Sequence, residues 1–230
     1  MERTLNLGVL AHVDAGKTSL TERILFRAGV IDAPGSVDKG TAQTDTLALE
    51  RQRGISIKSA VTSFRVGDLT INLIDTPGHA DFIAEVERAI GVLDAVILVI
   101  SAVEGVQPQT RRLSRAIASL GLPCVIFVNK IDRAGARDGH LIDEIARELR
   151  RHPVPLSTVS ALGTREASVD RRDPCRPAEA ERLVDALSRH DDALLARWLD
   201  AGGQVDPCDL MASLRRQVAG ARVTPIVHGS

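Results

Sequence analysis

The chain has 230 residues, a length that fits one large domain or one domain with a sizeable insertion. Hydrophobic residues make up 44% and charged residues 26% of the sequence, as in ordinary globular proteins, and the apolar runs are too short to span a membrane. The 29 basic and 30 acidic residues leave a net charge of −1, which argues against a protein that binds DNA directly through its overall charge.

The three cysteines, Cys124, Cys175 and Cys208, are far apart and form no CxxC pair. This spacing indicates reduced thiols rather than a zinc site or a disulfide framework. The N-terminus, MERTLNLGVL, lacks the ordered basic, apolar and cleavage regions of a signal peptide. We therefore expect a cytoplasmic protein, and a monomer.

Short apolar runs rich in branched residues alternate with segments of helical periodicity along the first 150 residues. Runs of four to eight such residues are typical of strands buried on both faces of a parallel sheet. The alternation predicts a doubly wound α/β fold. The predicted strands are residues 5–10, 70–74, 95–100 and 123–128, and the predicted helices are residues 17–28, 81–93, 108–120 and 138–150.

Two segments depart from this alternation. Residues 31–59 are polar and too long for an ordinary connection, so we expect a functional loop. Residues 59–66 alternate in polarity and should pair with residues 70–74 through a turn at Gly67 and Asp68.

After residue 152, prolines and charge clusters replace the strand–helix alternation. Residues 153–219 are predicted to be an insertion, and residues 223–228 the last strand of the sheet. The insertion helices and Trp198 should form a small core of their own; a partner surface is the alternative. Its helices are predicted at residues 178–189, 191–200 and 208–219.

The first predicted strand leads into AHVDAGKTS, residues 11–19, and then into a helix. The pattern resembles the phosphate loop GxxxxGK[ST], with Ala11 replacing the first glycine, which is harmless if Ala11 needs no positive φ. Helix N–H groups would face phosphate oxygens, Lys17 would offset the β and γ charges, and Thr18 would offer its hydroxyl to Mg²⁺. The predicted phosphate-binding residues are Asp14, Ala15, Gly16, Lys17, Thr18 and Ser19.

A second motif, DTPGH at residues 75–79, follows the predicted strand 70–74. Asp75 is placed to hold Mg²⁺ through a bound water. Gly78 can bring its N–H close to a γ-phosphate because no side chain intervenes. His79 would then lie within reach of the attacking water; the alternative is that it caps the next helix.

The third motif, NKID at residues 129–132, follows the predicted strand 123–128. Asp132 can accept two hydrogen bonds from guanine that adenine does not offer, which would select the base. Asn129 would brace the loop and the stem of Lys130 would lie along the base. Because carboxyl ends of parallel strands meet at one edge, the three motifs predict a single guanine-nucleotide site.

With these motifs, the chain resembles the G domain of translational GTPases, a group that includes elongation factor G and release factor 3. Within the group it most resembles the tetracycline-resistance ribosomal protection proteins. The resemblance implies a P-loop GTPase G domain, with a doubly wound, mostly parallel sheet and a partly helical insertion before the last strand. It implies a G domain of residues 1–152 plus 220–230 and an insertion subdomain of residues 153–219. The segments that carry it are LNLGVLAHVDAGKTSLTE, GSVDKGTAQTD, LERQRGISI, NLIDTPGHADF, DAVILVISAVEGVQPQTR, FVNKID and VHGS.

The resemblance also implies roles for residues outside the three motifs. Ser56 occupies the switch position that contacts Mg²⁺ and the γ-phosphate, where the protection proteins usually carry threonine. Val13 and Ile55 look like the apolar pair that screens His79 from the water. Ser230, after Gly229, looks like the start of the loop that contacts the guanine oxygen, and residues 160–162 (SAL) are the alternative.

The function implied is hydrolysis of GTP to GDP with Mg²⁺, stimulated by the large ribosomal subunit, in a factor that displaces tetracycline. The serine at position 56 favours an alternative, a nucleotide-binding module that hydrolyses little by itself. The G domain of elongation factor G or release factor 3 is a further alternative. The family carries more domains after the G domain, so this chain looks like a G domain separated from them.

Overall fold

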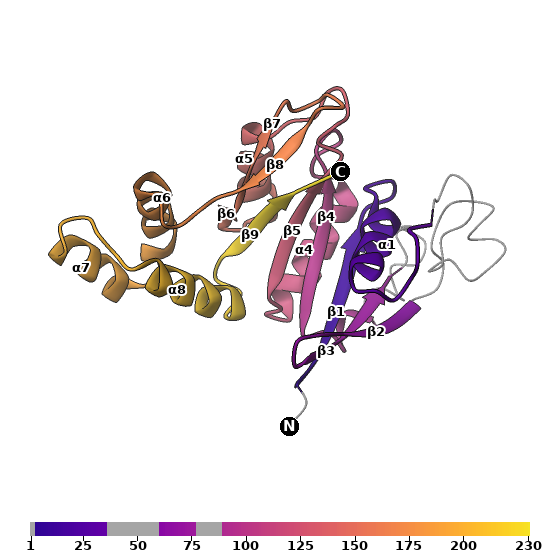
Figure 1. Cartoon of the computed structure of the whole chain (residues 1–230), viewed down its shortest axis with the longest axis horizontal. Helices are drawn as coiled ribbons and strands as arrows, with labels where there is room; N and C mark the ends of the chain where they lie inside the picture. The colour runs from indigo at the N-terminus through magenta and orange to yellow at the C-terminus, as the bar shows by residue number, and fades with distance from the viewer. Residues whose placement is uncertain (1–2, 36–59, 77–88) are drawn as a thin grey trace.

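The structure, a computed structural model, describes residues 3–35, 60–76 and 89–230. Seven strands form a sheet in the order β2-β3-β1-β4-β5-β9-β6, and β7 and β8 form a separate antiparallel pair (Figure 1). The strands are β1 (Arg3–Ala11), β2 (Ala60–Val66), β3 (Leu69–Asp75), β4 (Ala95–Ser101), β5 (Cys124–Asn129), β6 (Pro153–Pro155), β7 (Ser157–Ser160), β8 (Ser168–Arg171) and β9 (Thr224–His228). The helices are α1 (Lys17–Arg27), α4 (Pro108–Ser119), α5 (Gly139–Leu149), α6 (Pro177–Ser188), α7 (Asp192–Asp200) and α8 (Pro207–Ala219).

The main sheet is parallel except at one edge. β1 pairs in parallel with β3 and β4, β4 with β5, and β9 with both β5 and β6, whereas β2 runs antiparallel to β3. The predicted α/β fold with a mostly parallel sheet is therefore confirmed. The predicted turn between β2 and β3 is also present, with Gly67 at a φ of 62°.

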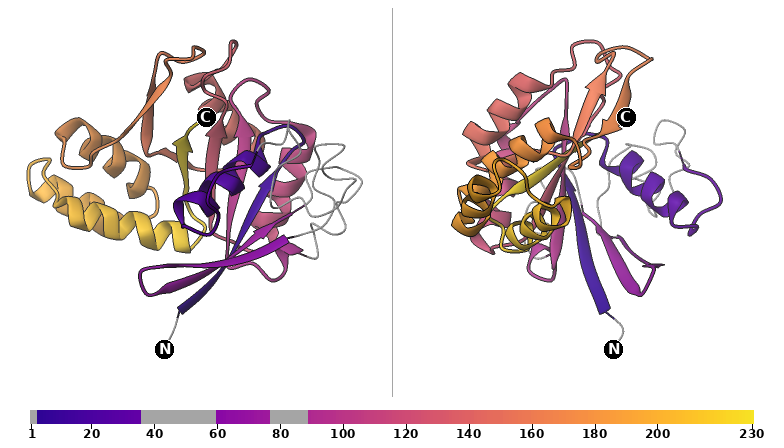
Figure 2. Two further views of the ribbon diagram at one scale, coloured as in Figure 1. Left: turned by 45° about the vertical axis from the view of Figure 1, so that its right-hand side comes forward. Right: turned by 60° about the vertical axis from the view of Figure 1, so that its left-hand side comes forward.

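Alternate residues of the strands face opposite layers of helix, as the pleat of a strand requires. Val9 and Ala11 of β1 pack in a cluster with Leu25 of α1, whereas Leu10, between them, packs in a second cluster with residues of α4 and α5. Figure 2 shows α1 on one side of the sheet and α4 and α5 on the other. Burial on both faces explains why the central strands are almost wholly apolar.

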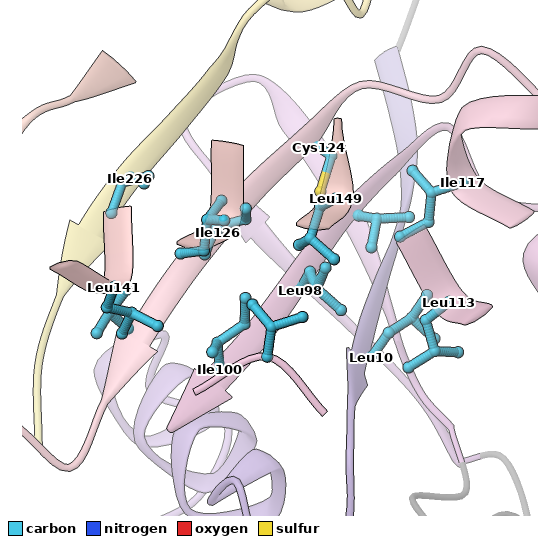
Figure 3. Packing of buried hydrophobic residues seen from close by; sticks show 14 of the residues in the cluster. Leu10, Leu98, Ile100, Leu113, Ile117, Cys124, Ile126, Leu141, Leu149 and Ile226 are labelled. Carbon is cyan, nitrogen blue, oxygen red and sulfur yellow. The ribbon is translucent and has the colours of Figure 1, made fainter. Parts of the chain in front are cut away.

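The larger cluster lies between the sheet and helices α4 and α5 (Figure 3). Leu98 and Ile126, from neighbouring strands, are fully buried there, against Ile117 of α4 and Ile145 of α5. This packing fixes the central strands β4 and β5, whose carboxyl ends carry part of the candidate site.

Helices α4 and α5 match the predicted segments to within a few residues. Pro108 begins α4, where its missing N–H costs no helical hydrogen bond, and Gly121 follows the helix at a φ of 63°. Of the predicted helix over residues 81–93, only the last part is described, and residues 89 and 90 are helical. Most of the long polar segment, residues 36–59, lies outside the described residues.

The segment predicted as an insertion contains the three expected helices, α6, α7 and α8. Their apolar residues form a cluster with Val154 and Val223, and Trp198 packs against it, as the core interpretation predicts. In Figure 1 these helices extend to one side, beyond β6 and β9.

Two features of this segment differ from the expectation. Pro153–Pro155 form β6, the edge strand of the main sheet beside β9, although the predicted insertion begins at residue 153. Prolines are tolerated at a sheet edge because an edge strand need not donate every backbone hydrogen bond. The hairpin of β7 and β8 was not predicted either, and the division of the chain into two domains stays a prediction.

The three cysteines are free, Cys124 buried in the core and Cys175 and Cys208 exposed. None of the helices among the described residues is long and apolar enough to cross a membrane.

Candidate nucleotide site

The turn between β1 and α1 has the backbone of an anion-binding loop. Ala11 ends β1 without a positive φ, so the missing first glycine needs no strained conformation. Asp14 and Gly16 have φ values of 62° and 89°, and left-handed residues at such spacing turn successive N–H groups toward one centre. Gly16 is the N-cap of α1 and offers no side chain to the first helical turn, whose N–H groups are suited to a phosphate.

Lys17, the first residue of α1, lies buried at this loop. Its Nζ donates to Asp75 Oδ1 over 2.6 Å, and each of the two side chains is only a few per cent exposed. Asp75 ends β3, which pairs with β1, so the sheet register brings together two residues 58 positions apart. Thr21 Oγ1 donates to the same carboxylate oxygen over 3.4 Å. The phosphate loop and the acidic end of β3 are therefore neighbours, as predicted.

The groups needed for Mg²⁺ are an alcohol and a carboxylate, because this ion prefers oxygen ligands. Thr18, half-buried in the first turn of α1, and Asp75, at the end of β3, supply that donor chemistry. The next residue, Thr76, donates its hydroxyl to the carbonyl oxygen of Val9, which holds the exit of β3 against β1. The residues present thus fit a magnesium site at the phosphate loop.

Asn129, at the end of β5, connects the predicted base loop with the phosphate loop. Its Nδ2 donates to the carbonyl oxygen of Ala15 over 2.8 Å. The same amide nitrogen occupies the position that a Cβ on Gly16 would need, so only glycine fits there. This hydrogen bond joins the two loops, and the bracing role of Asn129 stays a prediction.

The rest of the base loop turns away from the strand at Lys130, whose φ is 63°. Asp132 follows, partly exposed, and Ile131 N–H donates to Gly229 O over 3.4 Å. Since Val128 pairs with His228, the loops that leave β5 and β9 lie side by side, and Ser230 lies at the second of them. Gly163 N–H donates to Ile131 O over 2.7 Å, so the alternative segment at residues 160–162 also lies at this loop.

Four predicted site residues fall outside the described residues: Ile55, Ser56, Gly78 and His79. Val13, the described member of the predicted apolar pair, is partly buried in the phosphate loop. Asp14 and Ser19 are exposed and Ala15 is fully buried. The structure brings the remaining predicted residues to the carboxyl edge of the sheet, around the β1–α1, β3, β5 and β9 ends.

Two histidines next to the predicted loops were not singled out from the sequence. His12 lies within the phosphate-loop segment, buried, with its ring nitrogens against Thr110 Oγ1 at 3.1 Å and Glu104 Oε2 at 2.9 Å. Burial lowers the pKa of His12, and the nearby Glu104 carboxylate acts in the opposite direction. A polar residue at the exit of an apolar strand was the available signal in the sequence.

His228 is the second, at the end of β9 next to Gly229. Its Nδ1 lies 2.8 Å from Ser157 Oγ, which also accepts from the His228 backbone N–H. Its Nε2 lies 3.3 Å from Asp138 Oδ1, out of hydrogen-bond alignment, and neither atom has a hydrogen-bond partner among the described residues. Burial lowers the pKa of His228, against the opposing influence of Asp138. The histidine thus connects β9 with β7 through Ser157, and its second ring nitrogen lies near Asp138 at the start of α5.

This arrangement, with a phosphate loop, an acidic strand end and a base loop on one edge of a parallel sheet, defines a nucleotide-binding G domain. The profile of the family described as "Elongation factor Tu GTP binding domain" matches residues 2–230. The chain belongs to this family of GTP-binding domains.

The chain is also similar to individual proteins. It is 54% identical over 227 residues to an oxytetracycline resistance protein of Streptomyces rimosus, covering 98% of this chain and 34% of that protein. It is 51% identical over 228 residues to the tetracycline resistance protein TetM of Streptomyces lividans, covering 99% of this chain and 35% of that protein. The chain thus spans about a third of the length of these relatives.

A solved structure of a protein from Thermus thermophilus has the same fold. It superposes with a TM-score of 0.84 at 24% sequence identity, over 100% of this chain and 38% of the other. The family match and this likeness together establish the G-domain fold for the chain.

Proposed function

We propose that this G domain binds GTP with Mg²⁺ and hydrolyses it when stimulated by the ribosome, in a cytoplasmic factor that protects ribosomes from tetracycline. The proposal is supported by the hydrogen bond from Asn129 to Ala15, which holds the base loop against the phosphate loop. The names of the relatives from Streptomyces rimosus and Streptomyces lividans support the link to tetracycline.

The residues proposed to form the site fall into three groups, which bind the phosphates, the base and Mg²⁺. The phosphates would lie on residues 14–19 and on the N–H of Gly78, and the base on Asn129, Lys130, Asp132 and Ser230. Mg²⁺, when bound, would neutralise charge on the β and γ phosphates, held by Thr18 and Ser56 and, through water, by Asp75. We also propose that residues 1–152 and 220–230 form the nucleotide-binding unit, with residues 153–219, apart from the edge strand β6 that joins the main sheet, as an appended subdomain.

In the proposed reaction, water attacks the γ-phosphorus, the bond from that phosphorus to the bridging oxygen breaks, and GDP and phosphate leave. Lys17, held at the loop by Asp75, would offset the charge that collects on the oxygens as the bond breaks. His79 would orient the water. Val13 and Ile55 would screen His79 from that water until the ribosome binds. Without an activator, GTPases of this kind turn over at about 10⁻³ s⁻¹ or below.

Binding is tested by titrating the chain with GTP, GDP and ATP in the presence of Mg²⁺. We expect both guanine nucleotides to bind and ATP to bind far more weakly, because Asp132 has no partner on adenine. Equal affinity for ATP and GTP would contradict the proposed base loop.

Hydrolysis is tested by phosphate release with and without large ribosomal subunits. Stimulation by the subunits is the expected result. Tight GTP binding with no stimulation would instead indicate a nucleotide-binding module, the alternative that is suggested by the serine at position 56. Because the relatives are about three times as long, protection from tetracycline is to be tested with a full-length protein that contains this domain.

A further inference from the structure

Glu104, in the connection between β4 and α4, contacts both loops of the candidate site with one carboxylate. Its Oε2 lies 2.9 Å from His12 Nε2, and its Oε1 lies 3.5 Å from Lys130 Nζ. The backbone around it is held in place, because Glu104 N–H donates to Ser101 Oγ over 3.2 Å and Glu104 O accepts from Gln107 Nε2 over 2.8 Å.

The contact with His12 reaches the phosphate loop. His12 is 4% exposed, and its second ring nitrogen lies 3.1 Å from Thr110 Oγ1, so the ring is held from both sides. The carbonyl oxygen of His12 accepts from Ala15 N–H over 3.3 Å, inside the loop predicted to bind phosphate. The residue whose ring Glu104 contacts therefore also takes part in a backbone hydrogen bond inside that loop.

The contact with Lys130 reaches the base loop. Lys130 has a φ of 63°, a backbone conformation that residues other than glycine rarely adopt, at the point where the chain leaves β5. An anion beside its ammonium group favours one direction of the flexible stem, which is the part predicted to lie along the base.

We propose that Glu104 is a positioning residue that couples the phosphate loop to the base loop, so that the two ends of a guanine nucleotide are bound cooperatively. The inference rests on the proposed nucleotide site and adds to it a residue outside the three sequence motifs. Glu104 lies beside a cavity of about 450 Å³ that is also lined by His12, Val13 and Asp14, so the carboxylate is reached by water.

The size of the coupling follows from this exposure. The Glu104 side chain is 37% exposed and that of Lys130 is 28% exposed, and ion pairs in contact with water are screened. We therefore expect a coupling of about two- to fivefold in nucleotide affinity rather than a loss of binding.

The test is a double-mutant cycle on the affinity of the chain for GDP with Mg²⁺. His12→Gln and Lys130→Met are measured singly and together, first with Glu104 and then with Glu104→Gln. With Glu104 present, the double variant should lose about two- to fivefold less affinity than the product of the two single losses. With Glu104→Gln, this non-additivity should shrink, leaving only what the hydrogen bond from Asn129 to Ala15 transmits; a non-additivity of unchanged size would overturn the inference.

Glu148→Gln is the matched control, since Glu148 is a partly exposed carboxylate paired with Arg111 that contacts neither loop. It should leave both the affinity and the non-additivity unchanged. Single losses that multiply in the presence of Glu104 would overturn the inference. If the unaltered chain bound no GDP, the proposed function itself would be wrong, so the two failures are distinguishable.

A second measurement does not depend on the folding of the His12 variant. The titration of the His12 ring is followed by nuclear magnetic resonance in the unaltered chain, in Glu104→Gln and in Glu148→Gln. Among the residues that the structure describes, Glu104, Lys130 and Asp14 are the charged groups that act on this ring, and Glu104 acts to raise its pKa. Glu104→Gln should therefore lower the His12 midpoint and Glu148→Gln should not; an unchanged midpoint in Glu104→Gln would overturn the inference.

Discussion

Asn129 Nδ2 donates a hydrogen bond to the carbonyl oxygen of Ala15, across 114 residues of chain. One residue further along, Gly16 has a φ of 89° and no room for a Cβ beside the same amide. The base loop and the phosphate loop are thus in direct contact through a side chain of one and the backbone of the other. Neither loop can be displaced without disturbing its neighbour.

Gly16→Ala should weaken GDP binding by at least about tenfold, which corresponds to about 1.4 kcal/mol. The alanine would have to keep the left-handed backbone of Gly16, which is unfavourable for a residue with a Cβ, and its methyl group would displace Asn129. Affinity is measured with a fluorescent GDP analogue. Gly139→Ala is the control, because Gly139 starts α5 with nothing near its Cβ position and no positive φ. Unchanged affinity in Gly16→Ala would contradict the described loop.

Asp132→Asn should shift the preference of the chain from guanine to xanthine nucleotides. The amide replaces two acceptors by one acceptor and one donor, which complements the additional oxygen of xanthine. Competition between GDP and xanthosine diphosphate measures the shift. Asp143→Asn, on the exposed side of α5, should have no effect. If Asp132→Asn retained full guanine preference, Asp132 would not read the base.

His79→Ala should leave GDP affinity unchanged and lower ribosome-stimulated hydrolysis by about a hundredfold, the effect of losing a group that positions water or protons. The position lies outside the described residues, so this prediction rests on the DTPGH motif. Single-turnover phosphate release with ribosomes gives the rate. Loss of binding and of hydrolysis to the same degree would make His79 structural.

Acidification below about pH 6.5 should destabilise the chain through His228. Burial lowers the pKa of His228 from its ordinary 6.5, so the unfolded chain binds a proton more readily than the folded chain. The contribution of neutral His228 to the free energy of unfolding is therefore present above pH 6.5, and it is lost as the pH falls toward the lowered pKa of the folded state. His12, whose pKa burial also lowers, contributes in the same direction.

Urea unfolding at about pH 7.5 and about pH 5.5 measures this effect, at most about 1.4 kcal/mol per pH unit for each histidine. His228→Gln should reduce the pH dependence, and the exposed His140→Gln should leave it unchanged. A pH dependence as steep in His228→Gln as in the unaltered chain would exclude His228 as its source.

Leu98→Ala should lower the free energy of unfolding by about 2–5 kcal/mol. Leu98 is fully buried in the cluster between the sheet and helices α4 and α5, so the shorter side chain leaves a cavity. Leu120→Ala, at a side chain that is 54% exposed, should change it by less than about 0.5 kcal/mol. Both are measured by urea unfolding, and equal effects would mean that Leu98 is not in a packed core.

The sequence by itself determined the α/β class, most strands and helices and the order of the motifs along the chain. Buried parallel strands are apolar on both faces, and helices show a different period, so these elements can be recognised locally. The motifs end the strands, and carboxyl ends of parallel strands share an edge. This is why Lys17 and Asp75, 58 residues apart, could be expected to meet, and their side chains do so at 2.6 Å.

Only the tertiary structure decided which other residues join the site. The contact of His12 with Glu104 spans 92 residues and that of Ser157 with His228 spans 71. Such pairs depend on the positions of β9 and β6 in the sheet and on how the β4–α4 connection folds back on the phosphate loop, none of which leaves a local pattern. The short edge strand β6 was missed for the same reason, because its two prolines are compatible with a strand only where a sheet ends.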